Sequence, residues 1–245
     1  MSRRVLFVSL TCFAVVLCSA CNSLPGRPAA GAEVARPSQI VDFNVLFSQN
    51  CAGCHGPDGK GGAAIALSDP VYLAIADDST IRGFITHGIP GTPMSAFAEK
   101  SGGMLTAKQI DALVNGIRSW ANPAAVKDAA LPSYAARADG DPQRGAEVFR
   151  TYCSSCHGAD GRGGKAGSVV DGSYLALVSN QELRMNVILG RPASGAPDWR
   201  GDIPGKPLSE QEISDVVAWL AAQRPAVPGQ PYSASITDEM KGATR

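Results

Sequence analysis

The chain has 245 residues, of which 44% are hydrophobic and 18% are charged. An apolar fraction of this size supports packed cores and excludes a chain that is disordered throughout. Basic and acidic residues number 22 each, so no positive excess is available to neutralise a phosphate backbone, and we expect no nucleic-acid partner. The 27 glycines and 17 prolines indicate loop-rich domains with short helices.

The first 21 residues have the features of an export signal. Arg3 and Arg4 precede an apolar run that is shorter than the roughly 20 residues of a spanning helix. The end of this segment is similar to a bacterial lipoprotein signal, in which the cysteine after small residues receives lipid, although Cys18 replaces the usual leucine. Lipidation of Cys21, simple cleavage before it and an uncleaved anchor remain open. We expect a lipid anchor at Cys21 and a location on the periplasmic side of a bacterial membrane.

Shifts in composition divide the rest of the chain. Residues 22–39 are expected to be a flexible tether, 123–139 a linker rich in Ala and Pro, and 226–245 a tail. Two domains are left, 40–122 and 140–225. Each is small for a stable core of its own, so we expect a covalent or metal group to complete each one.

Four of the seven cysteines lie outside the signal, in two C-x-x-C-H motifs. This motif is the attachment signal for c-type haem. Its two thiols add to the vinyl groups of one porphyrin, and the adjoining histidine presents its imidazole to the iron. Paired zinc motifs lie about 15–20 residues apart, whereas 98 residues separate Cys54 from Cys153. A disulfide within each pair stays possible but does not explain the repeated histidine. We therefore predict two covalent haem c groups, bound by Cys51, Cys54 and His55 and by Cys153, Cys156 and His157.

The two motifs open an internal repeat. Tyr72 and Tyr174 each lie 17 residues after the histidine of their motif, and Pro90 and Pro192 each lie 35 residues after it. Each half resembles a small class I cytochrome c domain, and both domains together resemble a tandem dihaem cytochrome c. The resemblance implies an all-α fold, in which each domain is a small helical bundle around its covalent haem.

Helix starts are visible near the end of each half. Thr106 and Ser209 each precede a Gln or Glu three residues later, the spacing of a capping box. Apolar residues at i, i+3, i+4 and i+7 follow, which predicts a helix packed on one side. The resemblance implies that this helix crosses the one before the haem motif. Asp141 and Pro142 predict the start of that earlier helix in the second half, while the first half shows no equally clear start.

The sixth iron ligand differs between the halves. In cytochromes c a methionine opposite the histidine closes the iron and raises its potential. Met94, in a Gly- and Pro-rich loop 39 residues after His55, resembles that ligand, so His55 and Met94 are predicted to bind the first iron. Ala196 lies 39 residues after His157 and cannot bind a metal. The second iron is then bound by His157 and is five-coordinate, or it takes water or another side chain, of which Met185 is the nearest.

Other side chains near these loops have weaker signals. Met104 follows the loop of Met94 and is a weaker candidate ligand. His87 is the only histidine outside the motifs, and we expect it at the surface or beside a ligand. Arg191 and Arg200 flank the altered loop, where they either pair with haem propionates or remain solvated surface charges.

The predicted function is transfer of single electrons between exported redox partners of a respiratory or photosynthetic chain. Without Arg3 and Arg4 the chain has 20 basic and 22 acidic residues, which with four propionates favours a basic partner surface. Two alternatives stay open. One is a haem enzyme that acts on peroxide or a small gas at the second haem, and the other is an accessory haem subunit of a dehydrogenase or terminal oxidase.

Overall fold

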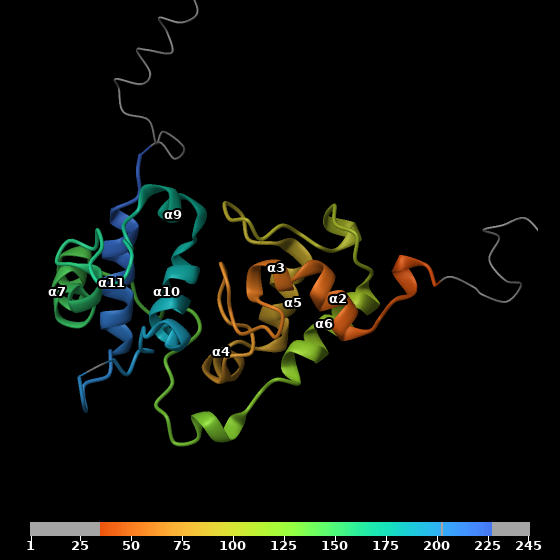
Figure 1. The fold of residues 1–245 in the computed structure, drawn as a ribbon, viewed down its shortest axis with the longest axis horizontal. Coiled ribbons are helices and arrows are strands. Elements are labelled where there is room, and N and C mark those ends of the chain that lie inside the picture. Colours follow the sequence, from red (N-terminus) through yellow and green to blue (C-terminus); the bar gives the residue numbers. More distant parts are fainter. Residues whose placement is uncertain (1–34, 202, 227–245) are drawn as a thin grey trace, which may run out of the picture. The chain divides into compact units, whose positions relative to one another are not determined.

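A computed structural model describes residues 35–201 and 203–226 (Figure 1). These residues form helices and two isolated β-bridges but no strand, which confirms the all-α fold. None of their helices has the length and apolar character of a membrane-spanning segment. The export signal, most of the tether and nearly all of the predicted tail lie outside the described residues.

The chain divides at Ile40 into two compact units, and the second of them holds both halves of the repeat. The described part of the first unit contains one 3-10 turn, η2 (Pro37–Gln39). The first half of the repeat consists of α2 (Phe43–Asn50), α3 (Ala52–His55), α4 (Pro70–Ile75), α5 (Asp78–His87), η3 (Glu99–Ser101) and α6 (Ala107–Arg118). The linker turn η4 (Pro123–Val126) is followed by α7 (Pro142–Tyr152), α8 (Ser154–His157), α9 (Gly172–Leu177), α10 (Asn180–Leu189), η5 (Pro192–Ser194) and α11 (Glu210–Ala222).

Side-chain caps fix the starts of the principal helices. Thr106 and Ser209 both complete the predicted capping boxes, which confirms the starts of α6 and α11. Asp141 accepts hydrogen bonds from the amides of the first turn of α7, with Pro142 in the first helical position. The first half also has a cap, because Asp42 Oδ1 accepts a hydrogen bond from the Val45 amide at 2.9 Å. This start escaped the sequence analysis because neither a proline nor a capping box accompanies it.

In each half the helix before the haem motif packs on the last helix, and Figure 1 shows α7 crossing beside α11. Both crossings are close enough to demand a glycine. A Cβ on Gly116 of α6 would lie 2.0 Å from the Phe43 ring. A Cβ on Gly145 of α7 would lie 2.0 Å from the Asp215 carbonyl oxygen and 2.8 Å from Cβ of Trp219. The small residue is thus on the last helix in the first half and on the first helix in the second half.

Aromatic rings fill the space beside both crossings. Trp120 stands edge-on to Phe43 and Phe47, with centroid distances of 5.1 and 5.0 Å. In the second half Phe149 and Trp219 pack with their centroids 4.3 Å apart. Such pairs add stability beyond the apolar area that they bury.

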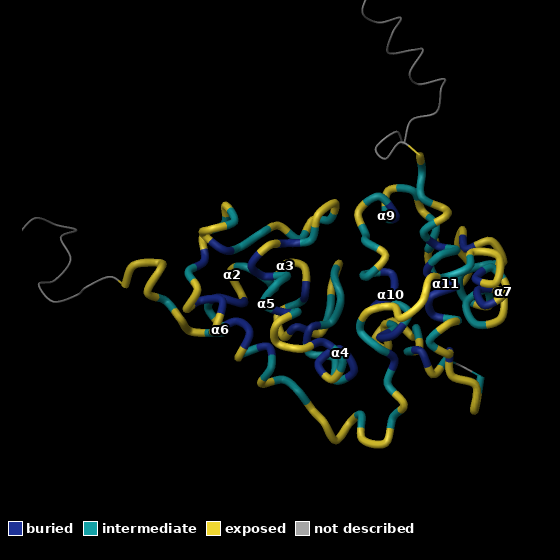
Figure 2. The backbone as a smooth tube through the Cα atoms, turned by 180° about the vertical axis from the view of Figure 1, so that it is seen from behind, coloured by how far each residue is buried: buried dark blue, intermediate teal, exposed yellow. Residues whose placement is uncertain are grey.

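The hydrophobic core is continuous between the halves. The larger of two buried clusters contains residues from α2 to α6 and from α7, α10 and α11, with Leu131 and Tyr134 of the linker packed against it. A second cluster, built around Leu175 and Leu183, lies between α9, α10 and α11. Figure 2 shows buried positions gathered along the helices, whereas the connecting loops are mostly intermediate or exposed.

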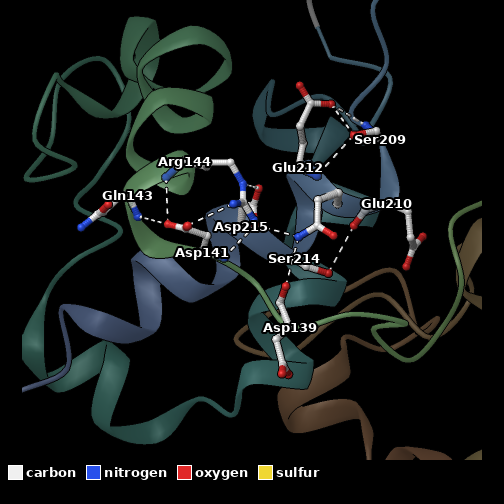
Figure 3. A network of polar contacts seen from close by, with 10 residues as sticks. Asp139, Asp141, Gln143, Arg144, Ser209, Glu210, Glu212, Ser214 and Asp215 are labelled. Atoms are coloured by element: carbon white, nitrogen blue, oxygen red, sulfur yellow. Dashed lines mark hydrogen bonds and ion pairs between the residues drawn. The ribbon is translucent and has the colours of Figure 1, made fainter.

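One buried carboxylate ties α7 to α11 (Figure 3). Asp215, only 2% exposed, accepts hydrogen bonds from the Asp141 amide at 2.7 Å, from Arg144 Nε and Nη2 at 2.9 and 3.0 Å, and from Gln211 at 2.9 Å. Burial by itself raises the pKa of this carboxyl group, but the bonds from Arg144, Asp141 and Gln211 outweigh it and lower the pKa. Its contribution to stability is therefore full above the ordinary aspartate pKa and is lost as the pH falls through the lowered value. The first half has Ala112 at the matching position.

The linker is bound to the second half rather than loose. Glu210 accepts hydrogen bonds from the hydroxyl and the amide of Ser133, at 2.6 and 3.1 Å. Arg184, 2% exposed, pairs with Glu210 and donates from Nε to the Tyr134 carbonyl at 3.1 Å. The Tyr134 ring lies 6.3 Å from that of Phe84 on α5. One linker residue therefore contacts both halves.

Alanine should have different effects on stability at two helical glycines, one at a helix crossing and one with open space around it. Gly145→Ala should lower the free energy of unfolding by about 1–3 kcal/mol, because the added methyl group overlaps the backbone of α11. Gly83→Ala in α5 should leave stability unchanged or raise it by up to about 1 kcal/mol, because its Cβ would meet nothing within 4 Å and alanine favours helix. Guanidinium unfolding of the haem-loaded protein, followed by circular dichroism, measures both. Equal stabilities for the two variants would contradict the close crossing.

Candidate haem sites

The first C-x-x-C-H motif lies at the junction of α2 and α3. Cys51 ends α2 and precedes α3, and Cys54 and His55 lie in the single turn of α3. His55 is 8% exposed, and its Nδ1 lies 2.9 Å from the Ile65 carbonyl oxygen. A proton on Nδ1 satisfies that contact and leaves the Nε2 lone pair free for a metal, an arrangement typical of metal-binding histidines.

The second motif repeats this geometry at the junction of α7 and α8. Cys153 ends α7, and Cys156 and His157 lie in α8. His157 Nδ1 lies 2.8 Å from the carbonyl oxygen of Gly167, which is ten residues on, as Ile65 is from His55. The sequence analysis did not find these two carbonyl groups, although their equal spacing in the repeat is a signal that points to them.

The chemistry of these side chains fits covalent haem. Burial, with a smaller effect of the partner cysteine, raises the pKa of Cys51 to about 11, and the same causes raise the pKa of Cys153 to about 11. Both cysteines are neutral thiols at neutral pH, the form that adds to a vinyl group of the porphyrin. Burial lowers the pKa of His55, opposed in part by its bond to the Ile65 carbonyl group, and the neutral imidazole is the form that binds iron.

The loop after each motif folds back onto the motif turn. In the first half the Gly61 amide donates to the His55 carbonyl oxygen at 2.8 Å, and the Ala64 amide donates to the Cys54 carbonyl oxygen at 3.0 Å. The matching pair in the second half has lengths of 2.9 and 2.9 Å. Both halves therefore hold the cysteine–histidine turn by the same two backbone bonds.

A second loop places Met94 and Ala196 in the same backbone position. The Ile89 amide donates to the Met94 carbonyl oxygen at 2.8 Å, and the Arg191 amide donates to the Ala196 carbonyl oxygen at 3.0 Å. Gly88 precedes the first of these loops with φ of 68°, and a Cβ there would lie 2.6 Å from the Met94 carbonyl oxygen. The backbone thus keeps the register that the sequence predicts, while the side chain at the ligand position differs.

The other candidate ligands are either exposed or packed in the hydrophobic core. Met104 is 82% exposed, and His87 is exposed at the end of α5, with Nδ1 3.5 Å from the Ser101 hydroxyl oxygen. Met185 is 1% exposed and belongs to the hydrophobic core on α10. The structure therefore places Met185 in apolar packing and Met104 at the surface.

Both arginines of the altered loop bind protein groups. Arg200 makes a bidentate pair with Asp198, donating from Nε to Oδ1 at 3.0 Å and from Nη2 to Oδ2 at 2.5 Å. Arg191 extends to the first half, where Nη1 donates to the Gly62 carbonyl oxygen at 3.0 Å and Nη2 to the Ala63 carbonyl oxygen at 3.4 Å. Both arginines are exposed, so they remain surface charges, and Arg191 in addition bonds to the first half of the repeat.

Family comparisons agree with this arrangement. Residues 142–223 match the family described as cytochrome c, and residues 39–115 match the family described as cytochrome c oxidase, cbb3-type, subunit III.

Curated relatives include two oxidase subunits and one subunit of a bc1 complex. The chain is 34% identical to the cbb3-type cytochrome c oxidase subunit CcoP of Azospirillum sp. (strain B510), over 56% of this chain and 47% of that protein. It is 33% identical to the cbb3-type cytochrome c oxidase subunit FixP of Azorhizobium caulinodans, over 55% and 45% of the two chains. The cytochrome bc1 complex cytochrome c subunit of Mycobacterium tuberculosis (strain H37Rv) is 24% identical, over 80% and 68%. The chain thus spans about half the length of the first two relatives.

Two family matches in tandem, one on each half of the repeat, agree with the two equivalent cysteine–histidine turns. The predictions of the fold class and of two haem groups are confirmed. The chain belongs to the c-type cytochromes, as a tandem dihaem protein whose two class I cytochrome c domains each carry one covalently attached haem c.

Proposed function

We propose that this cytochrome carries single electrons between membrane-associated partners of a respiratory chain. The printed names of its relatives, subunits of a cbb3-type oxidase and of a bc1 complex, support this role. The first haem is held by Cys51, Cys54, His55 and Met94. The second haem is held by Cys153, Cys156 and His157 and lacks the methionine.

The observation that carries the proposal is the shared backbone position of Met94 and Ala196. A bound haem supplies one-electron chemistry, and the protein sets its potential through ligands, burial and hydrogen bonds. In the first domain the Ile65 carbonyl group orients His55, and the loop bond from Ile89 holds Met94. Two fixed ligands suit a carrier, because little has to rearrange when the charge of the site changes.

The second domain is the reason to keep an enzyme as the second candidate. The methyl group of Ala196 leaves the ligand position of its loop free for water or a small molecule. A peroxide-processing site also needs groups that move protons. Of the charged side chains beside this loop, Arg200 is paired with Asp198 and Arg191 is bonded to Gly62 and Ala63. These contacts favour the carrier.

Anchoring to a membrane is the third part of the proposal. Cys21 lies in the lipoprotein-like segment, outside the described residues, and the tether 22–39 follows it. If flexible, the tether has an r.m.s. reach of about 20–25 Å. Lipid on Cys21 would keep the haem domains within that reach of the periplasmic membrane surface, beside neighbouring respiratory complexes.

Substitution of the first ligand tests the assignment of the haems. Met94→Ala should abolish the sulfur-to-iron absorption band of the ferric protein and lower the potential of one haem, because it removes the thioether that favours ferrous iron. Met104→Ala is the matched control, since that thioether is 82% exposed, and it should leave both readings unchanged. Optical spectra and a potentiometric titration measure the effects. Loss of the band in Met104→Ala alone would assign the ligand to Met104.

The alanine at the ligand position of the second loop leads to a separate prediction. The reduced unmodified protein should take up carbon monoxide at one haem, and Ala196→Met should suppress that uptake by supplying a thioether at the matching position. Peroxide turnover should be negligible in both proteins if the function is electron transfer. Turnover that is present in the unmodified protein and lost in Ala196→Met would favour the enzyme.

The anchor is tested by removing its acceptor sulfur. Cys21→Ser should release an otherwise intact dihaem protein into the soluble periplasmic fraction, because no lipid can then be added at this position. Fractionation with haem staining, beside Cys18→Ser as the control that keeps Cys21, measures the distribution. A Cys21→Ser protein that stays in the membrane would contradict lipid anchoring.

A further inference from the structure

We propose that Arg191 is the positioning residue that sets the rate of electron transfer between the two haems, by holding the Ala196 loop (residues 190–197) against the first haem loop (residues 60–66). The inference rests on the proposed function of single-electron transfer. In the step concerned, one electron moves from the second haem, which lacks the methionine that raises the potential, to the first haem, held by His55 and Met94. The second iron is oxidised as the first is reduced, and no bond is made or broken.

Arg191 is hydrogen-bonded through its backbone to Ala196, the residue at the ligand position of the second loop. Its amide donates to the Ala196 carbonyl oxygen at 3.0 Å, and its carbonyl oxygen accepts from the Ala196 amide at 3.1 Å. These reciprocal bonds form one of the two isolated β-bridges of the described residues. Any displacement of Arg191 is therefore passed directly to the residue at the ligand position.

The guanidinium group reaches a part of the first domain that is itself fixed to the haem motif. Arg191 donates to the Gly62 and Ala63 carbonyl oxygens, at 3.0 and 3.4 Å. The Gly62 amide donates to the Ala64 carbonyl oxygen at 3.2 Å, and the Ala64 amide donates to that of Cys54 at 3.0 Å. Gly62 also sits so close that a Cβ on it would lie 2.7 Å from the Cys54 carbonyl oxygen. A short series of hydrogen bonds thus connects Ala196 with a haem-binding cysteine of the other domain.

Arg191 also lines a cavity between the two loops. The cavity has a volume of about 470 Å³, and its other lining residues include Lys60, Ile65 and Ser68 of the first domain and Asn186, Leu189 and Ser194 of the second. The hydrogen bonds of Arg191 to Gly62 and Ala63 join the two loops beside this cavity. A charged donor makes stronger hydrogen bonds than a neutral one, which suits arginine to this role.

A separate contact keeps the domains together when Arg191 is removed. On the linker side, Arg184 and Gln181 donate to the Tyr134 carbonyl oxygen, and the Tyr134 ring packs near Phe84 of the first domain. An Arg191 variant therefore loosens the two loops without releasing one domain from the other. Because electron transfer between fixed centres falls steeply with their separation, such loosening should slow the step.

The experiment compares Arg191→Ala, Arg191→Lys and the control Arg200→Ala in the full haem-loaded chain. Arg200 is the matched control, because it carries the same charge just after the same loop and its side-chain hydrogen bonds go to Asp198 of its own domain. Pulse radiolysis delivers one electron to the oxidised protein, and its redistribution between the haems is followed optically. Hydrogen–deuterium exchange of residues 60–66 and 190–197 reports on the contact independently of electron transfer, and titration gives both potentials.

Arg191→Ala should slow redistribution at least tenfold and speed exchange in both loops, with the two potentials unchanged. The rates of redistribution and exchange in Arg191→Lys should lie between those of Arg191→Ala and those of the unmodified protein, because an ammonium group supplies a donor without the planar fork. Arg200→Ala should match the unmodified protein. An unchanged rate in Arg191→Ala, an equal loss in Arg200→Ala, or a loss explained by shifted potentials would overturn the inference. Failure of the proposed function would be seen separately, as peroxide turnover by the unmodified protein.

Discussion

The close crossing of the first and last helices is the constraint on which each domain depends. The cysteine–histidine turn starts where the first helix ends, at Cys51 in one domain and at Cys153 in the other, so the packing of α2 on α6 and of α7 on α11 determines where each haem motif stands. From this turn the following loop is held by two backbone bonds, and the histidine is oriented by a carbonyl group ten residues on. The haem sites are therefore consequences of helix packing, with the local loops adding the final orientation.

The duplicated backbone separates what the two sites share from what distinguishes them. The cysteines, the histidines, the carbonyl groups that orient them and the loop bonds recur in both domains. The side chain at one position, Met94 or Ala196, then decides whether a thioether is available. A change of redox role needs no change of fold in such a chain, because loops with the same hydrogen bonds can present different ligands. Arg191, in the position of Ile89, adds a contact between domains to the same loop.

Sequence reasoning succeeded where the information was local. The C-x-x-C-H motifs, the capping boxes at Thr106 and Ser209 and the shared register of Met94 and Ala196 follow from short spacings and their repetition. It missed the carbonyl groups of Ile65 and Gly167, because a backbone oxygen has no residue signature. It also missed the reach of Arg191 to Gly62 and the binding of the linker to Arg184, since contacts between residues 50 to 130 positions apart depend on the packing of whole elements.

The close-packed glycine lies on the last helix of the first domain but on the first helix of the second domain. This difference bears on how a duplicated chain avoids wrong helix pairing. Phe43 and Gly145 each lie eight residues before the first cysteine of their motif, and Gly116 and Trp219 each lie ten residues after the cap of the last helix. If α2 paired with α11 during folding, Phe43 would meet Trp219 and the helices could not approach. If α7 paired with α6, two glycines would face each other across a void. Tandem repeats are prone to such wrong pairings, and the complementary sizes at these crossings favour closure of each first helix on the last helix of its own domain.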